Sequence, residues 1–282
     1  MTMTESSGGR FDIGRVISRT SELIGRNIVP FGILSLVFTG APYFVMLLVL
    51  PALASATPDA SMLGVGFFVL IAVYLISSMV LQAALTRSSV DDLSGKTVSV
   101  GSAISTGVAV LLPMLGLALV YIGVILVAAL VIGVVAGALA MSGSMAPVMI
   151  ISVLFLVAAI YLILRWIVAA PVLVVERTGV FAAIRRSVAL TQNHRWAILG
   201  LLVLYAIFVI VLQLVVTAII PGAEAAAGGM PTEGVPIFAI VVLVLMQVVT
   251  SLIITVAIAS IYFELRQLKD GVGVTELAQV FA

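Results

Sequence analysis

The chain has 282 residues, of which 63% are hydrophobic and 9% charged, and its mean hydropathy is +1.37. This composition excludes an ordinary soluble domain, because apolar stretches of about 20 residues are those that cross a bilayer as helices. The net charge of +1 gives no reason to expect an acidic partner, and the lack of cysteine excludes disulfides, thiolate metal sites and cysteine nucleophiles.

The segment before the first apolar run has the pattern of an amphipathic helix. At about 100° per residue, its apolar and charged side chains fall on opposite faces. The apolar face consists of Ile13, Val16, Ile17, Thr20, Leu23 and Ile24, and the charged face consists of Arg15, Arg19, Glu22 and Arg26. We expect this helix to lie in the membrane interface with its arginines toward anionic head groups.

Six apolar segments follow, at about 28–53, 65–86, 108–140, 146–165, 197–220 and 236–262. The first is longer than the hydrophobic region of a signal peptide, so we interpret it as a transmembrane helix despite the cleavage-like pattern at Ala52 and Ala54. The third is long for one span. Because no charge or turn residue divides it, we expect a single helix whose membrane-crossing part begins near Leu115.

The basic residues are distributed on one side of these spans. All 13 lie in the N-terminus, the loop at 86–99, the stretch from Arg165 to Arg195, or the C-terminus, which share one side if there are six spans. The other three loops together contain Asp59, Glu224 and Glu233 and no Lys or Arg. The positive-inside rule therefore predicts a multi-pass protein of the bacterial inner membrane with both termini in the cytoplasm.

Three segments on this side resemble one another, at 11–30, 98–113 and 179–196. Each places two branched apolar residues four apart and then enters a span; the pairs are Ile13 and Ile17, Val100 and Ile104, and Val180 and Ile184. This weak repeat predicts an all-α integral membrane protein with six transmembrane helices in three hairpins, each preceded by a cytoplasmic interfacial amphipathic helix. We expect a single membrane domain over 1–282, with a cytoplasmic N-terminus (1–27), a six-span region (28–262) and a cytoplasmic tail (263–282).

The third of these segments is the most basic part of the chain. Its predicted apolar face contains Val180, Phe181, Ile184, Val188 and Thr191, and Pro171 before it predicts an extended interfacial segment after span four. Two interpretations stay open: a site for phosphate or lipid head groups, or the ordinary positive charge of a cytoplasmic loop. The candidate lipid or anion contacts are Arg15, Arg19, Arg26, Arg185, Arg186 and Arg195.

Residues suited to catalysis are few, and we expect no catalytic, metal or cofactor site. There is one histidine, and neither a G-x-S-x-G nor a G-x-x-x-x-G-K-[ST] motif. Glu176 with His194 is the single acid–base combination near the predicted cytoplasmic interface. Arg165 and Glu264, close to span ends, are expected to reach water. The span glutamines, which either bond neighbouring helices or line a path, are Gln82, Gln213 and Gln247.

Two stretches carry a family resemblance: RWIVAAPVLVVERTGVFAAIRRSVALTQNHRW at 165–196 and YFELRQLKDG at 262–271. They resemble bacterial six-span proteins of the glycerophosphoryl diester phosphodiesterase membrane-domain type and the related YciC-like group. The matching positions are Arg165, Pro171, Val172, Glu176, Gly179, Arg186, Ser187, Leu190, Thr191, Trp196, Tyr262, Leu265, Arg266 and Gly271. In members that give the family its name, such a module precedes a phosphodiesterase barrel. We expect no room for that barrel after residue 262 and too few histidines for its chemistry.

The sequence therefore predicts a non-enzymatic membrane module that organises the bilayer, senses lipids or docks a partner through its cytoplasmic amphipathic helices. Its expected partners are anionic membrane lipids, and a protein partner or a second copy. Nucleic acid is not expected, because basic residues are sparse and the aromatic residues lie in the spans. Two alternatives are a transporter- or permease-like component with a path between the hairpins, and an enzyme acting on lipid head groups through Arg185, Arg186 and Glu176.

Overall fold

The computed structural model describes residues 11–56, 60–96, 99–140, 146–226 and 236–270, and within these ranges it contains helices and no strands. The elements are α1 (Ile13–Arg26), α2 (Ile28–Ser35), the π-helical turn η1 (Leu36–Gly40), α3 (Ala41–Ala56), α4 (Ala60–Leu93), α5 (Val100–Ala109), α6 (Leu111–Ala140), α7 (Ala146–Trp166), α8 (Ala169–Glu176), α9 (Val180–Thr191), α10 (Arg195–Ala226) and α11 (Ile237–Asp270).

Six helical segments of the described chain are long and apolar enough to cross a membrane. They are Ile28–Leu53, Gly64–Leu93, Leu111–Ala138, Val148–Glu176, Arg195–Ile219 and Ile237–Asp270. The prediction of an all-α protein with six spans is confirmed, and the third apolar segment is one continuous helix, α6. Both α4 and α11 continue beyond their predicted ends, so α11 extends to Asp270 rather than ending near residue 262.

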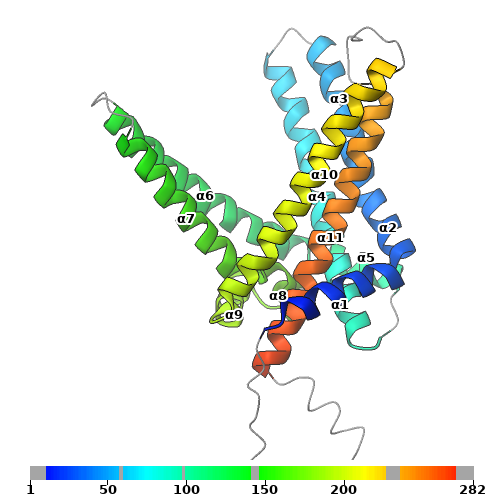
Figure 1. Ribbon diagram of the computed structural model, residues 1–282, viewed down its shortest axis with the longest axis vertical. Helices are drawn as coiled ribbons and strands as arrows, with labels where there is room; N and C mark the ends of the chain where they lie inside the picture. The colour runs from blue at the N-terminus through cyan, green and yellow to red at the C-terminus, as the bar shows by residue number, and fades with distance from the viewer. Residues whose placement is uncertain (1–10, 57–59, 97–98, 141–145, 227–235, 271–282) are drawn as a thin grey trace, which may run out of the picture.

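The long helices pack in sequential pairs, α3 with α4, α6 with α7 and α10 with α11 (Figure 1). The last helix, α11, contacts α1, α2, α3, α4, α8, α9 and α10, and a third of its most apolar stretch (33%) is buried, against 0% for α6. Figure 1 shows the reason: α6 and α7 diverge from the other long helices toward the end opposite the short helices. α11 is therefore the centre of the bundle, whereas α6 contributes Met114 and Leu117 to the core and exposes most of its later side chains.

Span one is irregular where it approaches α11. The π-helical turn η1 interrupts it, and a Cβ at Gly40 would lie 2.8 Å from Cγ2 of Val248, so glycine permits this close contact. The hydroxyls of Ser35 and Thr39, both buried, have no hydrogen-bond partner among the described residues. Polar atoms are thus buried in this span beside an unusual backbone segment.

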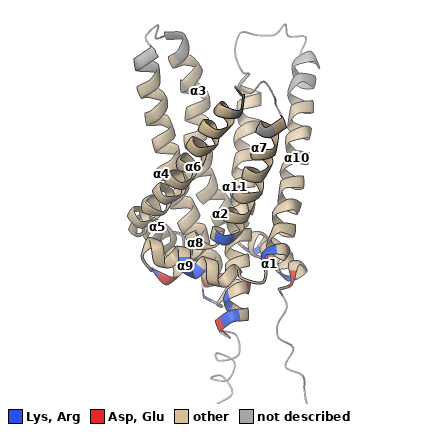
Figure 2. Ribbon diagram, turned by 90° about the vertical axis from the view of Figure 1, so that its left-hand side faces the viewer, with Lys and Arg blue, Asp and Glu red and all other residues tan. Residues whose placement is uncertain are grey.

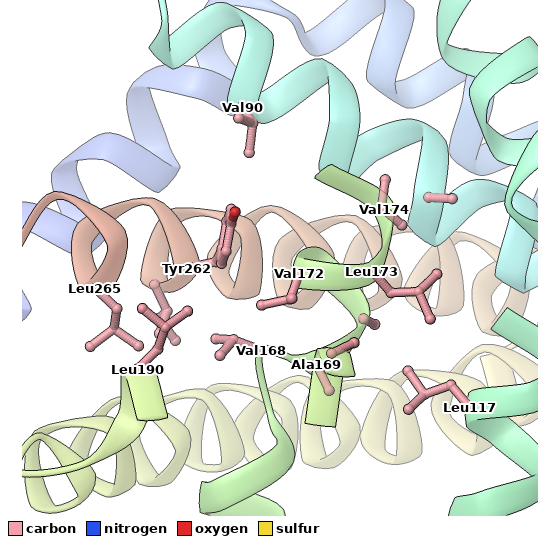
Figure 3. Packing of buried hydrophobic residues seen from close by; sticks show 14 of the residues in the cluster. Val90, Leu117, Val168, Ala169, Val172, Leu173, Val174, Leu190, Tyr262 and Leu265 are labelled. Carbon is pink, nitrogen blue, oxygen red and sulfur yellow. The ribbon is translucent and has the colours of Figure 1, made fainter. Parts of the chain in front are cut away.

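The expectation of an extended interfacial segment after span four is wrong. Residues Ala169–Glu176 form the helix α8, whose first six residues are buried. Pro171 lies in the first turn, where backbone N–H groups have no intrahelical partner, so the proline does not disturb the helix. Figure 3 shows α8 side chains between α11 and the neighbouring helices, where Leu173 lies in the same buried cluster as Leu190 and Tyr262.

The predicted faces of two short helices are only partly those that pack. In α1, Val16, Thr20 and Leu23 are buried, whereas Ile13 and Ile17 are exposed. In α9 the buried residues are Ala183, Ser187, Leu190 and Thr191, whereas Phe181, placed on the apolar face by the sequence, is 69% exposed. The buried face of α9 is therefore rotated from the predicted one toward small side chains, which allow the helix to lie closely on α8 and α7.

Candidate functional site

The charged side chains of the described residues gather at one end of the molecule, around α1, α8, α9 and the last turns of α11 (Figure 2). We call this part the charged end. The long helices cross the rest of the molecule with almost no charge, as expected for spans in a bilayer. Ionisable groups for binding or chemistry are consequently found at the charged end.

A buried carboxylate holds α1 against α11. Glu264 is completely buried (0% exposed), and Arg15 Nη1 donates to its Oε1 at 2.9 Å while Arg19 Nη1 donates to its Oε2 at 2.5 Å. Arg19 also donates to Gln267 and lies 5.4 Å from the centre of the Phe263 ring. Two charge-assisted hydrogen bonds compensate for removing the carboxylate from water. The expectation that Glu264 reaches water is therefore wrong.

A second ion pair joins the end of α1 to the end of α4. Arg26 Nη2 donates to Asp92 Oδ2 at 2.8 Å, and the amide of the buried Asn27 donates to Asp92 Oδ1 at 3.4 Å. Arg87 bonds Asp91 one turn away on α4 at 2.9 Å. The end of α1 is thus held against the end of α4 by charge as well as by packing.

A third network holds α9. Arg186 bonds Asp270 at the end of α11 and lies 3.5 Å from Glu176 Oε1, which also accepts a hydrogen bond from Tyr262 at 3.0 Å. Burial acts to lower the pKa of Arg186, but its hydrogen bond to Asp270 and the negative charges of Glu176 and Asp270 outweigh that and raise the pKa above its ordinary value. Lys269 donates to the Ala189 carbonyl. The guanidinium therefore stays charged and links α8, α9 and α11.

The remaining predicted contacts are arranged differently. Arg185 is exposed and forms no ion pair within the described part of the chain. Arg195 donates to the Tyr161 hydroxyl at 3.1 Å and lies over the Tyr161 ring, 5.0 Å from its centre. Next to it, Trp196 is 86% exposed. Contact of any of these arginines with lipid head groups stays a prediction; four of the six candidates are paired with carboxylates of the same chain.

The acid–base combination suggested for a lipid enzyme has other partners. Glu176 is bonded by Arg186 and Tyr262, while the His194 ring lies 5.8 Å from the Phe11 ring. Burial lowers the pKa of His194, and the positive charge of Lys269 lowers it further. Among the described residues, no group of three or more His, Cys, Asp or Glu could hold a metal ion.

Of the span glutamines, Gln247 makes the expected bond between helices. Its side-chain amide donates to the Tyr74 hydroxyl at 2.8 Å and so connects α11 to α4. Gln213 is exposed on α10 and Gln82 is half-buried on α4. The three span glutamines therefore differ in their surroundings, and Gln247 is the one whose bond to another helix is described.

The sequence analysis missed the acidic partners Asp92 and Asp270 and the central role of Glu264. Part of the signal was present: Asp91 and Asp270 stand four residues after Arg87 and Arg266, a spacing at which helical side chains meet. Glu264 interrupts an otherwise apolar stretch after Tyr262. An acid at such a position indicates a partner from another element.

Comparison with known protein families gives a match over the second half of the chain. Residues 139–271 match the family described as the membrane domain of glycerophosphoryl diester phosphodiesterase. This match contains α7 to α11 and both stretches that carried the resemblance in the sequence. No curated protein and no solved structure matches the chain. Residues 139–271 of this transmembrane chain are therefore similar to the membrane domain of glycerophosphoryl diester phosphodiesterase, the family that the sequence resembled.

Proposed function

We propose that the chain is a non-enzymatic module of the bacterial inner membrane that binds anionic lipid head groups at its charged end, which faces the cytoplasm together with both termini. Such binding would organise or sense the lipids around it, or present the surface to a protein partner or a second copy. The match of residues 139–271 to a membrane-domain family and the six apolar helices support a role within the membrane.

The exposed face of α9 is the observation that carries this proposal. Phe181 and Arg185 lie one helical turn apart on that face, and Trp196 follows at the start of α10. Exposed aromatic residues together with an arginine that has no carboxylate partner are typical of segments that lie at the level of lipid head groups. The ion pairs of Arg186 with Glu176 and Asp270 hold the helix in place. Arg185 therefore presents a positive charge without a carboxylate partner in the described structure, on a helix that Arg186 holds in place.

Replacing Arg185 tests the proposal. Arg185→Gln should reduce retention of phosphatidylglycerol during purification in mild detergent, because each basic residue near an anionic surface contributes about 1 kcal/mol. Arg185→Lys retains the charge and serves as the matched control. Native mass spectrometry of the bound lipids measures the effect. Equal phosphatidylglycerol retention by the parent and both variants would contradict the proposed head-group role.

The proposal also excludes hydrolysis by this chain. With one histidine in the whole sequence, we expect the purified protein to leave glycerophosphodiesters unchanged, relative to a mock preparation, with each divalent metal tested. Colorimetric detection of released glycerol phosphate is the measurement. Metal-dependent turnover that co-purifies in proportion to the chain would require an enzyme instead.

A transporter-like component is the second candidate. The irregular turn η1 in span one, with the partnerless buried hydroxyls of Ser35 and Thr39, favours it, because interrupted helices and buried polar groups line transport paths. A Ser35→Ala, Thr39→Val double variant would leave lipid retention unchanged under the leading proposal. Reduced accumulation of a solute in cells expressing this variant would support the second.

A further inference from the structure

A cavity of about 450 Å³ lies where α1 crosses α10 and α11. Its walls come from one face of each helix: Ile17 and Ile24 of α1, Tyr205 and Phe208 of α10, and Ile254 and Ala257 of α11. The volume is within the range of about 300–1,000 Å³ that holds small ligands in proteins. The bonds from Arg15 and Arg19 to Glu264 lie on the face of α1 opposite the cavity. They fix α1 on α11, so the position of this cavity wall is fixed as well.

The polar atoms in the walls are already used. The Tyr205 hydroxyl donates to the Thr250 carbonyl at 3.1 Å, Thr20 Oγ1 donates to the Val16 carbonyl at 2.7 Å, and Ser21 Oγ donates to the Ser18 carbonyl at 2.9 Å. The remaining wall is aliphatic or aromatic. A polar solute would lose its hydrogen bonds with water and gain none, and an apolar cavity does not retain water. The chemistry of the walls therefore selects a hydrocarbon ligand.

The cavity is continuous with the membrane-facing surface. Its rim includes Ile17 (42% exposed), Ile207 (52%) and Phe208 (41%), and the α10 part lies in the half of the span Arg195–Ile219 nearest the charged end. Figure 1 shows α1 crossing α11 before its last turns, so α1, which belongs to the charged end, borders this region on that side. The surroundings of the opening are consequently the acyl chains of a single leaflet.

The position of α1 determines where the head group of such a lipid lies. The arginines of this helix are paired within the chain: Arg15 with Asp12 and Glu264, Arg19 with Glu264, and Arg26 with Asp92. A lipid whose chain enters the cavity has its head group at the level of α1, so the apolar walls, and not charge, select the ligand.

We propose that this cavity is a binding site for one acyl chain of a phospholipid from the leaflet at the charged end. The acyl chain fills the space between α1 and the hairpin of α10 and α11. It thereby gives the wall atoms van der Waals contacts that they would lack around an empty cavity. This site is separate from the exposed face of α9. The head-group role of Arg185 and the acyl-chain site can therefore fail independently.

Photolabelling tests the site. The full chain is reconstituted in vesicles of phosphatidylethanolamine and phosphatidylglycerol, with a trace of phosphatidylglycerol that carries a diazirine on one acyl chain. After irradiation, mass spectrometry of peptides locates the adducts. We expect adducts concentrated on wall residues such as Ile17, Phe208 and Ile254, several-fold above the exposed α6 residues Leu126 and Leu130.

Filling the cavity provides the second arm. Ala257→Phe should reduce labelling of the wall several-fold, while Ala129→Phe on the exposed surface of α6 is the matched control and should leave it unchanged. If Ala257→Phe aggregates, Ile17→Phe fills the cavity from its exposed rim. Labelling of the wall no stronger than that of α6, or unchanged labelling in a folded cavity-filling variant, would overturn the site. Unchanged phosphatidylglycerol retention in Arg185→Gln would not.

Discussion

At the scale of single residues, Glu264 explains how an arginine-rich helix can be stable on an apolar bundle. Its carboxylate is fully buried in the last span, yet both oxygens accept from guanidinium groups of α1. Removing one member of a buried ion pair costs about 3–5 kcal/mol when the other charge cannot reach water. Here the Arg15 and Arg19 side chains are 48% and 22% exposed, so part of that cost is avoided.

Glu264→Gln should therefore lower the free energy of unfolding by about 1–3 kcal/mol, the cost of an unsatisfied buried polar contact. The glutamine keeps the shape but loses the charge that holds both arginines. We expect a lower midpoint of thermal unfolding in detergent and faster tryptic cleavage after Arg15 and Arg19. The matched control is Glu22→Gln, an exposed acid of α1 without an ion pair in the described structure. Equal cleavage rates in the two variants would show that Glu264 does not fasten α1.

His194 makes a small contribution that depends on pH. Burial and the charge of Lys269 hold the pKa of His194 below its ordinary value in the folded protein, so the unfolded chain binds the proton more readily. The resulting stability is present above about pH 6.5 and is lost as the pH falls below that value. The parent should lose more thermal stability between about pH 7 and pH 5 than His194→Gln, which removes the one histidine. Parallel changes in both proteins would contradict this assignment.

These residue-level features mark the limit of prediction from the sequence. The arginine positions and the helical face they share were predicted from residues adjacent in the chain. Their partner, Glu264, stands 249 positions after Arg15, and nothing in local periodicity relates the two. An acid near a span end reaches water by default, and only the packing of α1 over α11 removes that access.

At the scale of elements, close packing of the short helices depends on small residues as well as on apolar faces. In α5, a Cβ at Gly107 would lie 2.8 Å from the Val80 carbonyl oxygen and 3.0 Å from Val80 Cγ1 of α4. In α9, the buried Ala183 and Ser187 play a similar part, and Ser187 Oγ donates to the Arg165 carbonyl at 2.8 Å. The sequence predicted that these segments are helical. It did not predict which face packs against the bundle, because the faces were assigned from large apolar side chains and the packed faces contain small ones.

Gly107→Ala should separate α5 from α4 and lower stability by about 1–3 kcal/mol, since the methyl group meets backbone that cannot move aside. Gly101→Ala in the same helix is the control: a Cβ there has nothing within 4 Å. We expect that control to be neutral or to stabilise the helix by up to about 1 kcal/mol, because alanine favours helix over glycine. Thermal unfolding of both variants in one detergent provides the comparison. A destabilised Gly101→Ala would show that α5 tolerates no change, whatever its contacts.

At the scale of the whole molecule, hydropathy predicted the six long helices because each span is determined by its own residues. The arrangement of those helices was less predictable. The divergence of α6 and α7 in Figure 1 and the insertion of α8 into the core depend on contacts between distant segments. The run after Pro171 was predicted to be extended and interfacial. It instead forms the buried helix α8, whose side chains pack in one cluster with Leu190 and Tyr262.

The segregation of charge to one end leads to a prediction about orientation. Because the short helices and nearly all described Lys and Arg residues share that end, the positive-inside rule predicts that it lies in the cytoplasm. Alkaline phosphatase fused at Asp59, Met141 or Glu224 should therefore be active outside the inner membrane. Fusions after Lys96, Gln192 and Ala282 should instead be active only with a cytoplasmic reporter such as green fluorescent protein. Paired reporters at each site control for expression, since one of the two must give signal. An active phosphatase at Ala282, together with active fusions at Asp59, Met141 and Glu224, would require an odd number of crossings, and the arginines of α1 and those near Asp270 would then face opposite compartments. Such a result is incompatible with the bonds that join Arg15 and Arg19 to Glu264, so it would reject the fold and the orientation together.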